Sequence, residues 1–222
     1  MLQGIEAIIF DLDGTLIDSM WVWKQVDDSY MKQYRLVEPE NFHETMEGMS
    51  YTEVAEYFRE VFQLPKSAEE IKQEWLDMTL ALYQTEVELK SGVKELLAYC
   101  KEHEIRLGIA TSNTRTLVES VLEAREIRDY FQGLCTACEV SAGKPAPDVY
   151  LKVAKDLEVA PEKCLVFEDV LKGVQAGKNA GMKVCAVEDK GNILQREALR
   201  KQADYYIHGY EEILNKTYEV SK

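Results

Sequence analysis

The stretch Ala7-Ile8-Ile9-Phe10-Asp11-Leu12-Asp13-Gly14-Thr15 determines the architecture of this chain. Its first four residues are apolar, which is typical of a short strand buried on both faces of a parallel sheet. Asp11 and Asp13 would follow at the carboxyl end of that strand and point the same way if the backbone stays extended. Gly14 permits a sharp turn there. Because two neighbouring carboxylates repel each other, this position favours a cation or a shared proton.

Further apolar runs predict strands at residues 107–110, 165–167 and 184–187, with a weaker candidate at 134–137. Helical periodicity separates these runs, as in Leu117, Val118, Val121 and Leu122. Alternating strands and helices predict an α/β fold, with a Rossmann-like parallel sheet core flanked by helices and connected by right-handed crossovers.

One interval interrupts the alternation. Roughly 70 residues separate the first strand from the next core-like helix near Gly92, where a crossover needs only about a dozen. The interval carries two apolar stripes at helical spacing, Val54, Tyr57, Phe58, Val61 and Phe62, and then Ile71, Trp75, Met78 and Leu82. Pro39 and Pro65 separate the helical stretches. We predict a helical cap domain at residues 18–88, inserted into a core domain of residues 1–17 and 89–222, and placed as a lid over the strand ends.

Polar residues follow the other predicted strands as well. Thr111, Ser112 and Asn113 end one strand and suit phosphate oxygens, although they could equally cap a helix. Lys144 lies between a glycine and a proline in a loop that leads into a helix, which suits a cation aimed at a fixed charge. Glu168 and Asp169 end a further strand and suit a hard cation with oxygen ligands. Because all these strand ends share one edge of one sheet, their convergence predicts a phosphate site.

The composition narrows the choice of partner. The chain has 222 residues, 46% of them hydrophobic, and a formal net charge of −14. Such an acidic protein repels nucleic acids and anionic membranes, so we expect neither as a partner and expect a small phosphorylated metabolite instead. We expect no signal peptide and a cytoplasmic location, because the amino-terminal residues lack a basic segment. Five cysteines predict no disulfide framework, and the pair Cys135 and Cys138 has no second pair to complete a zinc site.

Four motifs together resemble a known family. D-L-D-G-T-L-I-D-S (11–19), A-T-S-N (110–113), G-K-P-A-P-D (143–148) and F-E-D-V-L-K-G-V-Q-A-G (167–177) resemble, in order, the signature motifs of haloacid dehalogenase-like hydrolases. The resemblance spans nearly the whole chain, and the β-phosphoglucomutase-like and phosphoglycolate phosphatase-like branches are the most similar. The helical insertion looks like the C1-type cap of that family.

The resemblance implies an Mg²⁺-dependent phosphatase that hydrolyses a small phosphomonoester through an aspartyl-phosphate. Asp11 would be the nucleophile, and Asp13 would protonate the leaving oxygen and then deprotonate the attacking water. Thr111 and Lys144, with Ser112 and Asn113 beside them, would bind the phosphate oxygens. Mg²⁺ would lie among Asp11, the Asp13 carbonyl and Asp169, with Glu168 a ligand or a partner of the ligands.

Two alternatives stay open. A β-phosphoglucomutase-like sugar phosphomutase would carry an arginine after the Gly-x-Ser turn and a histidine in the first cap helix. This chain has Tyr51 after Gly48-Met49-Ser50, and Trp21-Val22-Trp23 in that helix. These aromatic residues could line a pocket or pack between cap and core. A non-catalytic phosphate-binding domain would have lost motif residues, and all of them are present. We also predict that Asp18 caps the first cap helix, and the sequence leaves the oligomeric state open.

Overall fold

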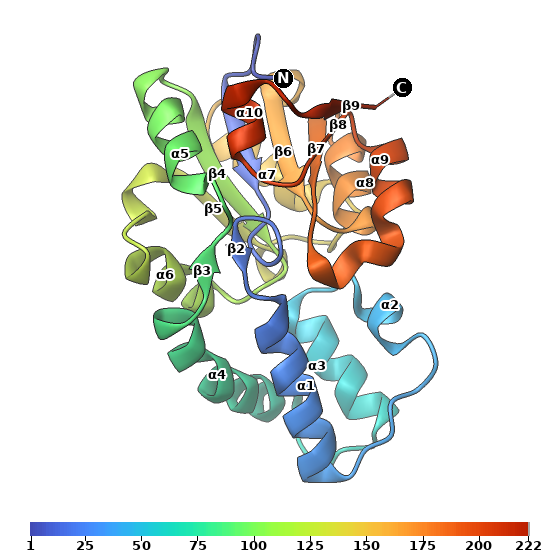
Figure 1. Ribbon diagram of the computed structural model, residues 1–222. Coiled ribbons are helices and arrows are strands. Elements are labelled where there is room, and N and C mark those ends of the chain that lie inside the picture. The colour runs from blue at the N-terminus through green and yellow to red at the C-terminus, as the bar shows by residue number, and fades with distance from the viewer. Residues whose placement is uncertain (222) are drawn as a thin grey trace.

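The computed structural model describes residues 1–221 and contains a seven-stranded sheet at one end of the molecule (Figure 1). The strands are, in spatial order, β5 (Gly133–Thr136), β4 (Arg106–Thr111), β1 (Ala7–Phe10), β6 (Cys164–Glu168), β7 (Lys183–Val187), β8 (Tyr205–Ile207) and β9 (Glu219–Val220). Neighbouring strands run parallel, except that β9 is antiparallel to β8. The predicted α/β fold is confirmed, including the weaker candidate strand at β5.

The central position of β1 determines where the strand ends meet. Phe10 pairs with Ile109 of β4 on one side and with Phe167 of β6 on the other. The three strands therefore end nearly level, and the residues that follow them share one edge. All four residues of β1 are fully buried, which is why this strand reads as a continuous apolar run rather than an alternating one.

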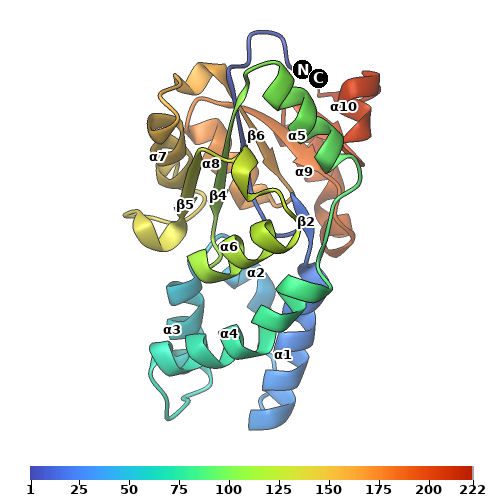
Figure 2. The ribbon, with the colours of Figure 1, turned by 90° about the vertical axis from the view of Figure 1, so that its left-hand side faces the viewer.

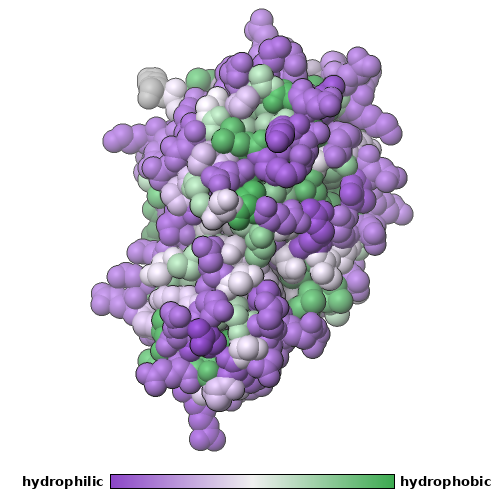
Figure 3. Space-filling view, turned by 180° about the vertical axis from the view of Figure 1, so that it is seen from behind, coloured by the Kyte–Doolittle hydropathy of each residue, from purple (hydrophilic) through white to green (hydrophobic). Residues whose placement is uncertain are grey.

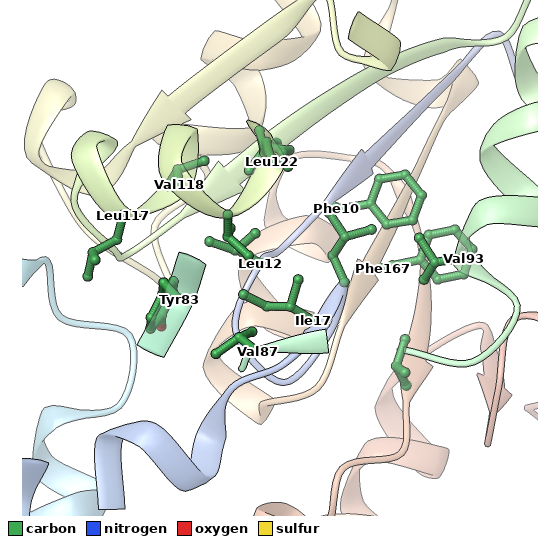
Figure 4. Close-up of a cluster of buried hydrophobic side chains, with 14 of the residues drawn as sticks. Phe10, Leu12, Ile17, Tyr83, Val87, Val93, Leu117, Val118, Leu122 and Phe167 are labelled. Atoms are coloured by element: carbon green, nitrogen blue, oxygen red, sulfur yellow. The ribbon is translucent and has the colours of Figure 1, made fainter. Parts of the chain in front are cut away.

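Helices cover both faces of the sheet (Figure 2). Ile8 and Phe10 face a cluster that includes residues of α5 (Val93–Glu102), α6 (Arg115–Ala124) and α10 (Glu211–Asn215). Ala7 and Ile9 face a second cluster, built with α7 (Asp148–Asp156), α8 (Leu171–Asn179) and α9 (Arg196–Gln202). In the first cluster the rings of Phe10 and Phe167 stack with centroids 5.2 Å apart. Figure 4 labels both residues within this cluster.

Four helices lie beyond the carboxyl edge of the sheet (Figure 1). They are α1 (Met20–Tyr34), α2 (Phe42–Met46), α3 (Tyr51–Val61) and α4 (Ala68–Thr85). A two-stranded antiparallel ribbon of β2 (Ile17–Asp18) and β3 (Glu88–Leu89) connects them to the core. Capping boxes begin α3 at Ser50 and α4 at Ser67, since each serine and the glutamate three residues later satisfy each other's backbone amides. We propose that residues 18–88 form the cap domain.

Three details of the cap differ from the sequence expectations. Helix α4 buries Ile71, Trp75, Thr79 and Tyr83, whereas Met78 and Leu82 are half-buried. In α3, Val61 is exposed. The prediction that Asp18 caps α1 is wrong: Ser19 holds the N-cap position, and Asp18 pairs with Glu88 in the ribbon, which keeps the backbone extended for one residue longer.

The surface and the thiols complete the description of the fold. Figure 3 shows one face of the molecule covered mostly by hydrophilic side chains. Of the helices in residues 1–221, none has the length and apolar character that crossing a membrane requires. All five cysteines are free thiols, as predicted, and four of them are buried while Cys138 is exposed.

Candidate active site

The predicted site residues meet at the carboxyl edge of the sheet. Asp11 follows β1, Lys144 comes from the loop before α7, and Glu168 and Asp169 lie at the end of β6. The Lys144 ammonium lies 2.6 Å from Asp11 Oδ1 and 2.5 Å from Glu168 Oε1. The four residues are at most 7% exposed. Charges that lie far apart in the sequence are thus brought into one buried group.

The loop after β1 is shaped by Gly14, which has a φ of 79°. This left-handed conformation is one that glycine adopts without steric cost. A Cβ at this position would overlap the carboxylate of Asp169. The hydroxyl of Thr15, the next residue, donates to Asp169 Oδ1 at 2.9 Å. The turn that the sequence predicted at Gly14 therefore also holds the acid at the end of β6.

Glu168 fixes the position of Lys144. Its Oε1 accepts a hydrogen bond from Tyr150 at 2.8 Å in addition to the ammonium, and its Oε2 accepts the backbone amides of Asp169 and Val170. A Cβ at Gly173, in the first turn of α8, would occupy the space of the Glu168 carboxylate. The small residue at this position is required because the helix approaches a buried side chain.

Burial and charge shift the pKa values of the group. Burial raises the pKa of Asp11 to about 7, against the opposing effect of Lys144 and with a further rise from Glu168. Burial, with Glu168 and Asp11, holds the pKa of Asp169 well above its ordinary value. Burial acts to lower the pKa of Lys144, yet Asp11 and Glu168 raise it above its ordinary value. Lys144 therefore stays charged. Its single positive charge does not offset the burial of Asp11 and Asp169, whose pKa values remain raised.

The donor set fits a divalent cation. Asp11, Glu168 and Asp169 each offer a carboxylate oxygen, and these oxygens lie within 4.8 Å of one another. With all three carboxylates ionised, the single ammonium would leave two negative charges in a buried space, which is the charge that Mg²⁺ would balance and which the raised pKa values of Asp11 and Asp169 disfavour in its absence. Carboxylate oxygens are also the ligands that this hard cation prefers.

Asp13 lies at the boundary of core and cap, and several donors surround its carboxylate. Ser19 donates to Oδ1 at 2.6 Å and Trp23 Nε1 at 3.3 Å. The hydroxyl of Tyr83 from α4 also donates to Oδ1. The amide of Asn113 donates to Oδ2 at 2.8 Å. The sequence expectations did not include Tyr83, whose one signal was the four-residue spacing from Ile71 through Trp75 and Thr79.

The residues at the end of β4 and directly after it make different contacts. Thr111 is buried, and its hydroxyl oxygen accepts the backbone amide of Asn113 at 3.0 Å, which leaves its proton available to a phosphate oxygen. The carbonyl of Ser112 accepts the backbone amide of Tyr51 from the cap. The amide side chain of Asn113 is engaged with Asp13 and Tyr83, so we propose that it holds Asp13 in place of the phosphate contact expected from the sequence.

A cavity of about 930 Å³ extends from the charged edge to the cap. Asp11, Asp13 and Lys144 line it on the core side. Trp21, Trp23, Met49 and Tyr51, which the sequence left open between a pocket and an interface, all line the cavity. The rings of Trp23 and Tyr51 meet edge to face with centroids 6.1 Å apart. His43 lines the cavity too, although the sequence suggested no role for it.

Known proteins resemble this chain along its length. The family model described as "Haloacid dehalogenase-like hydrolase" matches residues 8–187. A phosphorylated carbohydrates phosphatase of Thermotoga maritima is 31% identical over 225 residues, covering 97% of this chain and 100% of the relative. Hexitol phosphatase B of Escherichia coli is 32% identical over 188 residues, 83% of this chain and 84% of the relative.

Solved structures agree with the sequence relatives. The crystal structure of CbbY from Rhodobacter sphaeroides in complex with xylulose-(1,5)bisphosphate superposes with a TM-score of 0.82 at 25% identity, covering 94% of this chain and 96% of that one. A β-phosphoglucomutase from Clostridium difficile, at 23% identity and a TM-score of 0.78 over 96% and 97% of the two chains, shares the fold. The resemblance that the four motifs indicated is confirmed. This chain belongs to the haloacid dehalogenase-like hydrolases.

Proposed function

We propose that this protein is an Mg²⁺-dependent phosphatase that hydrolyses a small phosphomonoester through an aspartyl-phosphate on Asp11. The observation that supports it most strongly is the buried contact of Asp11 with Lys144, beside the carboxylate of Asp169 and within the cavity that Asp13 also lines. The two named phosphatases among the relatives support the same class of reaction.

The reaction proceeds in two displacements. An oxygen of Asp11 attacks phosphorus, the bond from phosphorus to the ester oxygen breaks, and Asp13 gives its proton to the departing alkoxide. Water then attacks the aspartyl-phosphate, Asp13 takes the proton of that water, and Asp11 is regenerated with release of inorganic phosphate. Thr111 and Lys144 bind the phosphoryl oxygens as charge develops on them.

Mg²⁺ would be held by the carboxylates of Asp11 and Asp169 and by the carbonyl of Asp13, and when bound it supplies positive charge to the phosphoryl group. Glu168 uses both its oxygens on protein donors. We therefore assign Glu168 the role of fixing Lys144 and of adding negative charge near the cation.

The charged residues that line the cavity indicate which groups the substrate carries beyond its phosphate. Of the described residues that line the cavity, ten are aspartate or glutamate and three are lysine. Lys144 is held by Asp11 and Glu168, and Lys24 is paired with Asp28 at 3.1 Å. Lys190, the third lysine, is exposed and follows β7 of the core, so a second phosphate on the cap side of the cavity would meet carboxylates rather than cations, at a cost in free energy. We propose a substrate with a single phosphate and an uncharged, hydroxyl-bearing remainder, which favours a phosphatase over a phosphomutase.

The test is release of inorganic phosphate from a panel of phosphate esters, with and without EDTA. We expect turnover that requires added Mg²⁺ and that falls by at least about 10⁴-fold in Asp11→Asn, since the nucleophile is removed. Asp129→Asn, an exposed acid far from the site in the sequence, is the matched control and should keep full activity. Unchanged turnover in Asp11→Asn would contradict the mechanism, and conversion of a sugar 1-phosphate to its isomer without phosphate release would favour the mutase.

A further inference from the structure

The hydrogen bonds around Asp13 are unevenly distributed between its two oxygens. Ser19, Trp23 and Tyr83 all donate to Oδ1, whereas Asn113 donates to Oδ2. A carboxylate oxygen has about two lone pairs. Trp23 is the most distant of the three donors to Oδ1, at 3.3 Å, so Ser19 and Tyr83 occupy the two lone pairs of Oδ1. Among the described residues, Oδ2 has one donor and room for one more partner.

Tyr83 is the most deeply buried of these donors that come from the cap helices. Its side chain is fully buried, and Figure 4 shows it at the edge of the apolar cluster that contains Leu12 and Leu117. Its hydroxyl oxygen accepts the Asn113 amide at 3.2 Å. Since that amide occupies the oxygen from one side, the hydroxyl proton is directed to Asp13.

We propose that Tyr83 is a positioning residue for Asp13: its hydroxyl fixes Oδ1 and leaves Oδ2 as the oxygen that exchanges the proton with the leaving group. The inference rests on the proposed function, because it assigns a role to Asp13 in proton transfer. Tyr83 belongs to α4 of the cap, so the orientation of Asp13 depends on the cap being in place over the sheet edge.

Leaving-group dependence separates a positioning role from a structural one. Phenolate needs protonation as it departs, whereas 2,4-dinitrophenolate departs without it. Variant and wild type are compared on the same ester, so the difference in size between the two rings cancels. The value of kcat/KM reports the first displacement, in which that proton moves. We expect Tyr83→Phe to lower kcat/KM for phenyl phosphate about 10- to 100-fold and for 2,4-dinitrophenyl phosphate less than about 3-fold.

Tyr30→Phe is the matched control. Tyr30 is a second buried tyrosine of the cap, and its hydroxyl donates to Glu74 at 2.9 Å; neither residue lines the cavity. Its loss should leave the ratio of the two kcat/KM values unchanged. Trp23→Phe removes another donor to Oδ1 and should shift the ratio in the same direction as Tyr83→Phe. It tests the proposal if the Tyr83→Phe protein does not fold.

The outcomes are distinct. Equal losses for both esters in Tyr83→Phe, or no loss for either, would overturn the positioning role while leaving the phosphatase intact. Hydrolysis of both esters by the wild-type protein that persists in Asp11→Asn would instead reject the proposed function. A wild-type protein that hydrolyses neither ester would reject both.

Discussion

The carboxyl edge of the sheet and the helical cap bury different kinds of side chain. At the sheet edge, charged side chains are buried: Asp11, Lys144, Glu168 and Asp169 are at most 7% exposed and hold one another. In the cap the buried side chains are mostly apolar and include many aromatic rings, as where Phe58 meets Trp75 edge to face at 4.9 Å, and the acids of the cap that line the cavity are more exposed. Buried charges must keep a fixed geometry because a lost partner is costly, whereas exposed charges can change at little cost.

We propose from this difference that the edge carries out the chemistry and the cap selects the substrate, with Tyr83, the cap residue whose hydroxyl reaches Asp13, as the exception. A change at the edge should reduce turnover of every ester, since all share the phosphoryl group. A change in the cap should alter affinity, selectivity or local stability. Three substitutions test this division, beyond those of Asp11 and Tyr83.

The largest effect is expected at Gly173. In Gly173→Ala, the added methyl group would occupy the space of the Glu168 carboxylate, which supports Lys144 at 2.5 Å. We expect kcat to fall about 100-fold or more for all esters, and the free energy of unfolding to fall by about 1–3 kcal/mol from overpacking. Phosphate-release kinetics and thermal unfolding measure the two effects.

Gln175→Ala, at an exposed position of the same helix, is the control and should change neither quantity. Full activity in Gly173→Ala would show that the position of Glu168 is not critical, and would weaken the distinction between edge and cap.

A smaller effect is expected where the cap contacts the core. Glu47 accepts the backbone amide of Lys172 at 3.1 Å, at the beginning of α8, and the side-chain amide of Gln195 at 2.9 Å. Removing charged hydrogen bonds of this kind costs about 1.5–3 kcal/mol each when they are fully formed. We expect Glu47→Ala to raise KM about tenfold, because the cap is held less firmly over the site, with kcat nearly unchanged.

Initial rates across a range of substrate concentrations separate the two constants for Glu47→Ala. Glu40→Ala removes an exposed acid of the same cap segment that does not line the cavity, and it should leave KM close to the wild-type value. A fall confined to kcat in Glu47→Ala would place this residue with the chemistry rather than with the cap.

The smallest effect concerns stability and pH. Burial raises the pKa of Asp27 to about 6, although His43 opposes the rise, while Glu38 and Asp28 add to it. The folded state therefore binds a proton more tightly than the unfolded state, and the stability that this proton confers is lost as pH rises through about 4 to 6. Because Asp27 is partly exposed, we expect Asp27→Asn to gain about 1–2 kcal/mol at pH 8 and nothing below pH 4.

Urea unfolding at pH 4, 5, 6 and 8 measures the effect at Asp27. Glu86→Gln, at an exposed position of the cap whose charge does not act on Asp27, should follow the wild-type dependence on pH. A gain for Asp27→Asn that is constant from pH 4 to pH 8 would mean that the acid is not perturbed in the folded cap.

The sequence by itself determined the core of the fold and which residues lie at the strand ends. An apolar run such as residues 7–10 predicts a strand that is buried on both faces of a sheet. Parallel strands then place their carboxyl ends on one edge of that sheet. Asp11, Lys144 and Glu168 could therefore be predicted to converge, since connectivity carries that information. The short strands at the ribbon and at β8 and β9 were missed, because two or three residues carry no readable periodicity.

The tertiary structure decided which side chains of the cap reach the core. The pattern in α4 was read as burying Met78 and Leu82, yet Thr79 and Tyr83 are buried instead, because the partner of this face is partly polar: the Tyr83 hydroxyl meets Asp13 and Asn113. Hydrophobic periodicity locates a helix but cannot show that a buried position ends at a carboxylate. That contact between distant segments, like the lining of the cavity, exists only once cap and sheet are packed together.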